Sequence, residues 1–429
     1  MRILITNGKA FINNELVQKD ILIEDKKIVK IADVIEESAD TVIDAEGKVV
    51  LPGFVDLHAH LRDPGQNHKE DIVTGTAAAA KGGFTTICAM PNTFPIVDSI
   101  ATVEYIQRKA ADLGKCKVKV IGAMTKGSQG IEISEYATMK EGGIVAVSDD
   151  GGCVQNAKIA QNCMKYAYNF GLPVIIHAED YNLAGTGLVN AGRISSQLGL
   201  GGIPGLAEEI IISRDIMLAE DIGVRLHIAH ISTAKGIELV RNAKAQGVAI
   251  TTEVTPHHIT MNEDAVYGFD TNTKVKPPLR HEKDRLACIA GLKDGTIDYI
   301  ATDHAPHSDY EKEKEYDIAP FGINGFETAF ASINTFLIKP GVIDLAIIVN
   351  AMSDKPAQFL GLNCGKLKEG YLADLNIIDL EGVIEINSET MLSKSINTPY
   401  INKSLTGKVE YTICEGRITW QAEQLAISN

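Results

Sequence analysis

The sequence lacks patterned cysteine, since none of its seven cysteines forms a Cys-x-x-Cys pair. An odd, scattered set predicts free thiols in a reducing compartment and argues against a disulfide framework. Long apolar runs are also lacking, because the longest are of strand length and far short of the ~20 residues that span a membrane. The N-terminal segment MRILITNGKAF shows no charged stretch followed by an apolar core, so we expect no signal peptide. These absences predict a cytoplasmic protein with no membrane partner.

Positive charge is in deficit, with 41 Lys and Arg against 56 Asp and Glu and a formal net charge of −15. This balance argues against a nucleic acid or an acidic membrane as partner. An anionic small molecule can still bind, provided that a basic residue lies inside the site. With 45% hydrophobic and 23% charged residues, the composition is that of an ordinary globular protein. The length of 429 residues suits a large catalytic barrel with a satellite domain, hence a cytosolic enzyme.

Apolar runs separated by helical spacers dominate the middle of the chain. The pattern changes to such runs after Pro52-Gly53, and amphipathic stretches such as TVEYIQRKAADL lie between them. Near-continuous apolar strands are typical of a parallel sheet that is covered on its outer face. Eight of them predict an α/β fold of the (β/α)8 TIM-barrel type. The predicted strands are 53–60, 84–90, 117–124, 144–150, 173–179, 225–231, 249–257 and 299–306.

The two ends of the chain resemble each other in pattern. The first fifty residues alternate in short strands, and a strand pattern returns near residue 364 with GYLADLNIIDL and GKVEYTICEGRITW. Neither end is long enough to form a good domain alone. We therefore predict that 1–52 and 364–429 pair into one small β-sandwich beside a barrel at 53–363.

Polar residues follow the predicted strands, at the C-terminal mouth where the active sites of this fold lie. Residues i and i+2 of a strand share a side, so His58 and His60 can reach one metal ion. Imidazole is a common ligand of zinc and related metals, and carboxylates such as Asp303 complete such sites. Either Asp149 or Asp150 faces the site from the fourth strand, and parity leaves the choice open. Six histidines lie at or just beyond strand ends: His58, His60, His177, His230, His304 and His307.

The other histidines have plainer interpretations. His227 lies three residues before His230, so it is predicted to face the helices as a hydrogen-bonded packing residue. His68 and His281 are predicted to lie at the surface. The end of the seventh strand leaves one further contributor open, either His257 or His258.

Short motifs along the barrel resemble the amidohydrolase superfamily and, within it, the dihydroorotases of the class I bacterial type. HAHLRDPG at 58–65 resembles the family's metal-and-substrate motif, in which an arginine follows the second histidine by two positions. MPNT at 90–93 resembles its substrate-binding turn. The resemblance runs from about residue 45 to 380. The other motifs, in the family's order, are AMTKGSQG, VSDDG, HAED, GIPGLAEE, RDIMLAE, HIAHIST, EVTPHH, KPPLR, ATDHAPH and PFGINGFETAF.

The resemblance implies a metal centre and a group that transfers protons. Asp150 would bridge two metals, which favours it over Asp149, and Asp303 would both touch the first metal and move protons. The expected cofactor is Zn²⁺, with one or two ions per subunit. The implied ligands are His58, His60 and Asp303 for the first ion, and His177 and His230 for the second.

The resemblance also implies the substrate, N-carbamoyl-L-aspartate or its cyclic product (S)-dihydroorotate, in de novo pyrimidine (UMP) biosynthesis. Arg62 and Asn92 would bind the substrate carboxylate, so Arg62 is the internal cation that an acidic chain needs. A bidentate guanidinium–carboxylate contact supplies geometry as well as charge. The implied substrate contacts are His60, Arg62, Asn92, Lys276, His307 and the backbone at Phe321 and Gly322.

Two positions depart from common patterns. Many superfamily members bridge their metals with a carboxylated lysine, whereas the fourth strand here ends in Asp149-Asp150 and offers none. In KVKPPLR, Lys276 stands where relatives usually place a substrate-contacting asparagine. One hypothesis is that its ammonium adds a charge to the carboxylate site, and the alternative is that the loop directs it to solvent.

Two rival functions remain. A dihydropyrimidinase, hydantoinase or allantoinase would act on neutral or differently charged rings, and such enzymes often carry the bridging lysine. A non-catalytic scaffold for aspartate transcarbamoylase would be expected to have lost metal ligands, yet all six implied ligands are present. Association with aspartate transcarbamoylase and a homodimeric state are further expectations from the family.

Overall fold

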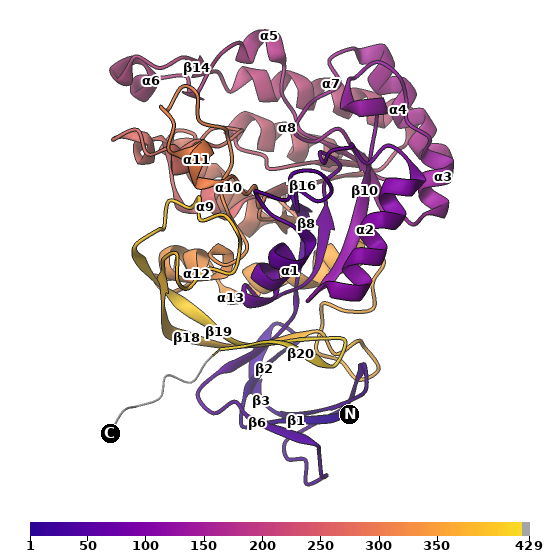
Figure 1. Ribbon diagram of the computed structural model, residues 1–429, viewed down its shortest axis with the longest axis vertical. Coiled ribbons are helices and arrows are strands. Elements are labelled where there is room, and N and C mark those ends of the chain that lie inside the picture. Colours follow the sequence, from indigo (N-terminus) through magenta and orange to yellow (C-terminus); the bar gives the residue numbers. More distant parts are fainter. Residues whose placement is uncertain (423–429) are drawn as a thin grey trace.

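The middle of the chain forms a parallel barrel. A computed structural model describes residues 1–422 and orders eight parallel strands as β17-β16-β15-β12-β11-β10-β9-β8. The seam closes where Ala59 and His304 form a parallel bridge. The predicted (β/α)8 barrel is thus confirmed (Figure 1). Its strands are β8 (Phe54–Ala59), β9 (Phe84–Ala89), β10 (Lys117–Ala123), β11 (Ala146–Ser148), β12 (Val174–Ile176), β15 (Leu226–Ile228), β16 (Ile250–Val254) and β17 (Tyr299–Ile300).

Helices connect the strands and cover the barrel. They are α1 (Ile72–Lys81), α2 (Ile100–Leu113), α3 (Tyr136–Glu141), α4 (Ala157–Asn169), α7 (Leu206–Ile222), α8 (Ala234–Ala245) and α10 (Glu282–Asp294). After the last strand come α12 (Ala329–Ile333), α13 (Leu345–Val349) and α14 (Lys355–Phe359). Smaller elements lie in the connections: α5 (Tyr181–Ala184), β13 (Val189–Asn190), α6 (Arg193–Leu198), β14 (Gly202–Ile203), α9 (Pro256–Thr260) and α11 (Asp309–Lys312).

Apolar side chains pack on both faces of the barrel wall. All residues of β8 and β9 are buried, as expected for strands that have helices on one side and the barrel interior on the other. The interior cluster draws residues from most of the strands, among them Val55, Cys88, Ile121, Ile175 and Tyr299. The barrel is therefore a packed core rather than a pore, and it leaves the strand ends free to carry chemistry.

Both chain ends build the smaller β unit, as predicted. A four-stranded sheet has the order β5-β4-β1-β6, and a six-stranded sheet has the order β20-β19-β18-β7-β2-β3. One buried apolar cluster joins residues of both sheets, including Ile5, Ile23, Leu375 and Ile413. Figure 1 shows this unit below the barrel. Its strands are β1 (Arg2–Thr6), β2 (Lys9–Ile12), β3 (Glu15–Gln18), β4 (Asp20–Glu24), β5 (Lys27–Ala32), β6 (Thr41–Asp44), β7 (Val49–Pro52), β18 (Leu375–Ile386), β19 (Lys403–Cys414) and β20 (Arg417–Gln421).

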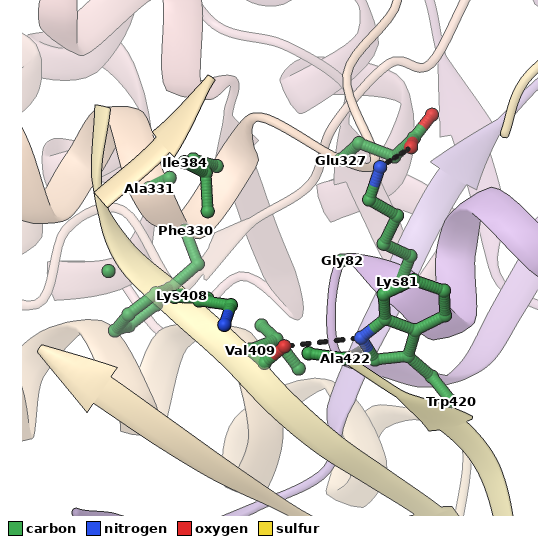
Figure 2. A pocket seen from close by; sticks show the side chains of 11 residues that line it. Lys81, Gly82, Glu327, Phe330, Ala331, Ile384, Lys408, Val409, Trp420 and Ala422 are labelled. Carbon is green, nitrogen blue, oxygen red and sulfur yellow. Dashed lines mark hydrogen bonds and ion pairs between the residues drawn. The ribbon is translucent and has the colours of Figure 1, made fainter. Parts of the chain in front are cut away.

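A small pocket marks the junction between the barrel and the C-terminal strands. Lys81 of α1 forms an ion pair with Glu327 at 2.9 Å, and Trp420 Nε1 donates to the carbonyl of Val409. Figure 2 shows the Lys81 and Trp420 side chains next to each other. The pocket holds about 80 Å³ and is lined by none of the residues predicted for the site.

The domain boundaries at 52 and 363 stay predictions. No helix within residues 1–422 is long and apolar enough to cross a membrane.

Candidate metal centre

Six side chains converge at the C-terminal ends of the barrel strands. They form three overlapping groups of buried residues, each with ligand atoms within 4.8 Å of one another. Each residue lies at or just past the end of a different strand, apart from the pair on β8. The groups are His58, His230 and Asp303; His58, His60 and Asp150; and Asp150, His177 and His230.

Irregular backbone geometry accompanies the convergence of these side chains. The pairing of β8 with β9 shifts register between Asp56 and Ala59, an irregularity of the ladder at His58. His230 and Asp303 have positive φ values of 33° and 47°, which L residues rarely adopt. Such backbone conformations cost about 1–3 kcal/mol and cluster at functional sites. The chain thus leaves strand geometry where its ligand atoms are needed.

Asp150 lies between two pairs of histidines. Its Oδ2 is 3.3 Å from His58 Nε2 and 3.4 Å from His60 Nε2. Its Oδ1 is 3.6 Å from both His177 Nδ1 and His230 Nε2. One carboxylate that faces four imidazoles has the arrangement of a bridging ligand between two cations.

Asp149 is turned away from this space. Its carboxylate accepts hydrogen bonds from the backbone N–H and the hydroxyl of Thr125, at 3.0 and 2.5 Å. Of the two acidic residues that parity left open, the structure therefore brings Asp150 to the histidines.

Unpartnered atoms test whether a metal fits here. His58 Nε2 and Asp150 Oδ1 are buried and have no hydrogen-bond partner in residues 1–422. Buried polar atoms without a partner are costly, so their persistence in a native site calls for an ion or another explanation. Four imidazole nitrogens and two carboxylates form a donor set that suits zinc and related divalent metals. The residues present fit the metal.

Asp303 joins the centre from the far side of the barrel seam. Its Oδ1 is 3.1 Å from His60 Nε2 and 3.5 Å from His58 Nε2. A carboxylate in this position can both hold a cation and exchange protons with a group bound beside it.

A second set of contacts orients the ligands. Glu253 on β16 accepts from His58 Nδ1 at 2.8 Å, and its other oxygen is 3.0 Å from His227 Nε2. Burial alone would raise the pKa of Glu253, but the His227 and His58 rings lower it to about 2. Asn92 Oδ1 lies 2.7 Å from His60 Nδ1. Such contacts fix ring orientation and the nitrogen that faces the metal.

His227 corrects one expectation from parity. It is hydrogen-bonded, to Glu253 and to Thr251 Oγ1 at 2.9 Å, as predicted. It faces the barrel interior and not the outer helices, because its partner Glu253 also contacts His58 and its ring packs on Tyr299 of the interior cluster. Strict alternation fails because β15 ends at Ile228, before the positive φ of His230.

A buried cation and a neutral imidazole lie beside the metal residues. Arg62 is 7% exposed, donates to the Pro306 carbonyl at 3.2 Å, and lies 3.4 Å from His307 Nε2. Burial lowers the pKa of Arg62 to about 10, so the guanidinium stays charged at neutral pH. Burial and the Arg62 charge lower the pKa of His307 to about 2, so that ring is neutral. This pair can receive an anion through the guanidinium and a polar ring atom through the imidazole.

Lys276 lies at the edge of the centre. Its ammonium is 2.8 Å from Glu179 Oε2 and 5.4 Å from the centre of the Phe321 ring. Glu179 in turn lies 3.9 Å from His177 Nε2. The Lys276 side chain is 31% exposed and ion-paired. Its ammonium is therefore neither directed fully to solvent nor free of a partner.

Gly322 allows two loops to approach each other. Its φ is +143°, and a Cβ there would lie 2.8 Å from the Ala305 carbonyl and 3.0 Å from the His307 ring. Its N–H donates to the Lys274 carbonyl at 2.9 Å. Only glycine fits this contact, which places the Phe321-Gly322 backbone against His307.

The remaining histidines take other positions. His304 stacks on Phe326 with ring centres 3.9 Å apart and is absent from the ligand groups. His258 bonds to Thr255 and to the Pro277 carbonyl. His257 is buried and its Nε2 has no hydrogen-bond partner in residues 1–422. The two predicted surface residues are exposed: His68 and His281.

Sequence reasoning missed Glu253 and Glu179. Glu253 stands in the predicted strand 249–257, where a lone carboxylate in an apolar run was the available signal. Glu179 follows His177 by two positions, in HAED, so the i, i+2 rule that selected His60 would also have selected it.

Comparison with known proteins places the chain in a family. Residues 47–236 match the family described as "Dihydro-orotase-like". A protein named dihydroorotase from Caldanaerobacter subterraneus subsp. tengcongensis is 52% identical over 424 residues, covering 98% of each chain. A dihydroorotase from Bacillus cereus is 45% identical over the full length of both chains.

Solved structures agree on the fold. L-hydantoinase from Arthrobacter aurescens superimposes with a TM-score of 0.89 at 24% identity, covering 99% of this chain and 97% of that one. Dihydropyrimidinase from Brevibacillus agri gives a TM-score of 0.85 at 22% identity, covering 99% and 96%. At such identities the likeness concerns the fold alone, whereas the full-length sequence identities identify the family. The chain belongs to the dihydroorotase family.

Proposed function

We propose that the chain catalyses the reversible cyclisation of N-carbamoyl-L-aspartate to (S)-dihydroorotate and water, in the de novo synthesis of UMP. The observation that carries this proposal is the buried Arg62, two residues past His60, beside a six-residue metal centre. A general hydrolase of neutral rings has no need of a buried cation. A substrate that bears a carboxylate offsets its desolvation.

The metal proposed for the centre is Zn²⁺, with one or two ions per subunit. His58, His60 and Asp303 would hold one ion, His177 and His230 the other, and Asp150 would bridge them. When bound, zinc supplies Lewis acidity, which lowers the pKa of water and polarises an amide carbonyl.

We assign proton transfer to Asp303. In hydrolysis, the water oxygen bonds to the ring carbonyl carbon and the carbon–nitrogen bond breaks. Asp303 accepts the proton of the attacking water and delivers it to the departing ring nitrogen, so the carboxylate ends as it began. In cyclisation, the same carboxylate takes a proton from the carbamoyl nitrogen and returns it to the departing oxygen.

The remaining residues bind and orient the ring. Arg62 pairs with the substrate carboxylate, and Asn92 adds an amide contact while it holds the His60 ring. The neutral His307 imidazole and the backbone at Phe321 and Gly322 contact the ring. Lys276 adds positive charge from the side of Glu179.

Metal analysis together with turnover tests this proposal. Purified protein should contain zinc and convert dihydroorotate and N-carbamoyl-L-aspartate into each other, while hydantoin and allantoin react poorly. Chelation should abolish turnover, and added Zn²⁺ should restore it. Preferential turnover of hydantoin or allantoin would show that dihydroorotate is not the substrate. Protein with neither metal nor turnover would indicate a scaffold.

The setting of the enzyme completes the proposal. We place it in the cytoplasm as a homodimer, with association to aspartate transcarbamoylase as a further expectation. Light scattering of the purified chain, alone and mixed with that enzyme, tests both assemblies.

A further inference from the structure

A segment of the C-terminal unit leaves its sheet and packs against the barrel. Residues 387–402 join β18 to β19, and Figure 1 shows this yellow loop rising beside α12 towards α9. Its backbone donates from Leu392 and Ser393 to the Glu327 carboxylate, at 2.9 and 3.2 Å. Its Asn397 carbonyl accepts from the N–H of Asn324 at 2.9 Å. The segment is thereby fixed to the chain that follows the last barrel strand.

Asn397 makes three hydrogen bonds with its side-chain amide. Nδ2 donates to the carbonyls of Ala305 and Gly322, at 3.0 and 3.1 Å. Oδ1 accepts from the backbone N–H of His307 at 3.1 Å. The residue is 3% exposed, so water does not compete with these bonds. The amide orientation is fixed as well, because a flipped amide would set its oxygen against two carbonyls and its NH₂ against an N–H.

The three partners belong to two loops that meet in the site. Ala305 and His307 follow the last barrel strand, and Gly322 lies in the loop that follows α11. The amide links the two loops, which lie so close that a Cβ on Gly322 would clash with the Ala305 carbonyl. The His307 ring lies 3.4 Å from Arg62. By holding the His307 backbone, Asn397 therefore also helps to set the position of the imidazole relative to the buried guanidinium.

We propose that Asn397 is a positioning residue, which fixes the spacing between His307 and the Gly322 backbone and so shapes the ring-binding half of the pocket. The inference rests on the proposed function for the role of those two groups. Asn397 bonds none of the six metal-centre residues. It should therefore govern substrate affinity and leave metal content unchanged, since geometry held by supporting hydrogen bonds is what preorganises a site.

Two variants separate the bonds. Asn397→Ala removes all three. Asn397→Asp is close in shape and keeps the acceptor for the His307 N–H, but it turns a carboxylate oxygen towards two carbonyls. We expect KM for dihydroorotate to rise about tenfold or more in both variants, a factor of ten being about 1.4 kcal/mol. Zinc content should equal that of the unmodified protein. Asn387→Ala is the matched control, because Asn387 Oδ1 accepts only from Glu389 and Thr390 within its own turn, and it should leave KM unchanged.

Amide hydrogen exchange gives a readout that needs no substrate. The His307 N–H should exchange faster in Asn397→Ala but stay protected in Asn397→Asp, whereas a general loss of stability would speed exchange across the barrel in both. Unchanged KM in both variants, or unchanged His307 exchange in Asn397→Ala, would overturn the positioning role. If the unmodified protein fails to turn over dihydroorotate, the proposed function fails, and the exchange experiment still decides whether Asn397 holds the two loops.

Discussion

Glu253 Oε1 lies 2.8 Å from His58 Nδ1, on the side of the ring opposite the metal centre. A carboxylate behind a metal-binding imidazole fixes its tautomer and makes it a better ligand. The second Glu253 oxygen contacts His227, so the carboxylate is held from both ends.

Glu253→Gln should weaken zinc binding about 10- to 100-fold, because the amide keeps the shape of the contact but removes its negative charge. Competition with a chromophoric chelator measures the affinity. Glu381→Gln, at an exposed ion pair with Lys339, is the control. Equal zinc affinity in the two variants would show that the Glu253 charge does not support the metal.

Asp303→Asn should retain metal and lose turnover. The amide oxygen can still face the cation, but an amide cannot accept the proton of the attacking water, and general acid–base catalysis contributes about 10²- to 10⁴-fold. Zinc content and kcat in both directions are the measurements. A kcat near that of the unmodified protein would refute the proton-transfer role.

Lys276→Asn should raise KM for dihydroorotate about fivefold with little change in kcat, since a partly exposed charge contributes about 1 kcal/mol. Glu179→Gln provides the opposite change, because it frees the Lys276 ammonium from its 2.8 Å ion pair and should lower KM. Unchanged substrate affinity in Lys276→Asn would reject the role of its ammonium.

Lys312 should make stability depend on pH. Its ammonium donates to the carbonyls of Thr271 and Pro320, both at 2.9 Å. Burial, with the nearby Lys274 charge, lowers its pKa from 10.5 to about 7. Between pH 7 and 10.5 the unfolded chain binds a proton that the folded chain lacks, so this group makes the free energy of unfolding rise with pH.

Lys312→Met removes that titration. Its Tm relative to the unmodified protein should be highest near pH 7 and should fall as the pH approaches 10. Lys314→Met, two positions further along the chain, is the control for the loss of one lysine. Parallel curves for Lys312→Met and the unmodified protein would contradict the lowered pKa.

Much of the fold was readable from the sequence because its signals are local. Strand β8, for example, is buried on both faces, so the mainly apolar run FVDLHA marks it without knowledge of its neighbours. The strand ends then located the candidate ligands, and the motif resemblance selected Asp150 where parity could not. The structure brings Asp150 and not Asp149 to the four histidines.

The supporting residues could not be read in this way. Glu253 meets His58 across 195 positions of chain, and Asn397 meets His307 across 90. No periodicity links such pairs, since they depend on how the closed barrel and the C-terminal segment pack. Parity also misplaced His227, because alternation holds only while a strand lasts and β15 ends at Ile228.

The seam of the barrel runs through the metal centre, since Ala59 bridges His304 beside His60 and Asp303. His60 and Asp303 are separated by 243 positions. During synthesis, the early ligands therefore leave the ribosome long before the chain that completes their site. A nascent chain that ends before Asp303 has only an open barrel and an incomplete ligand set. With the proposed ligand set, acquisition of the full metal complement would report that the first and last strands have joined, and it would favour the closed barrel over a partly folded chain.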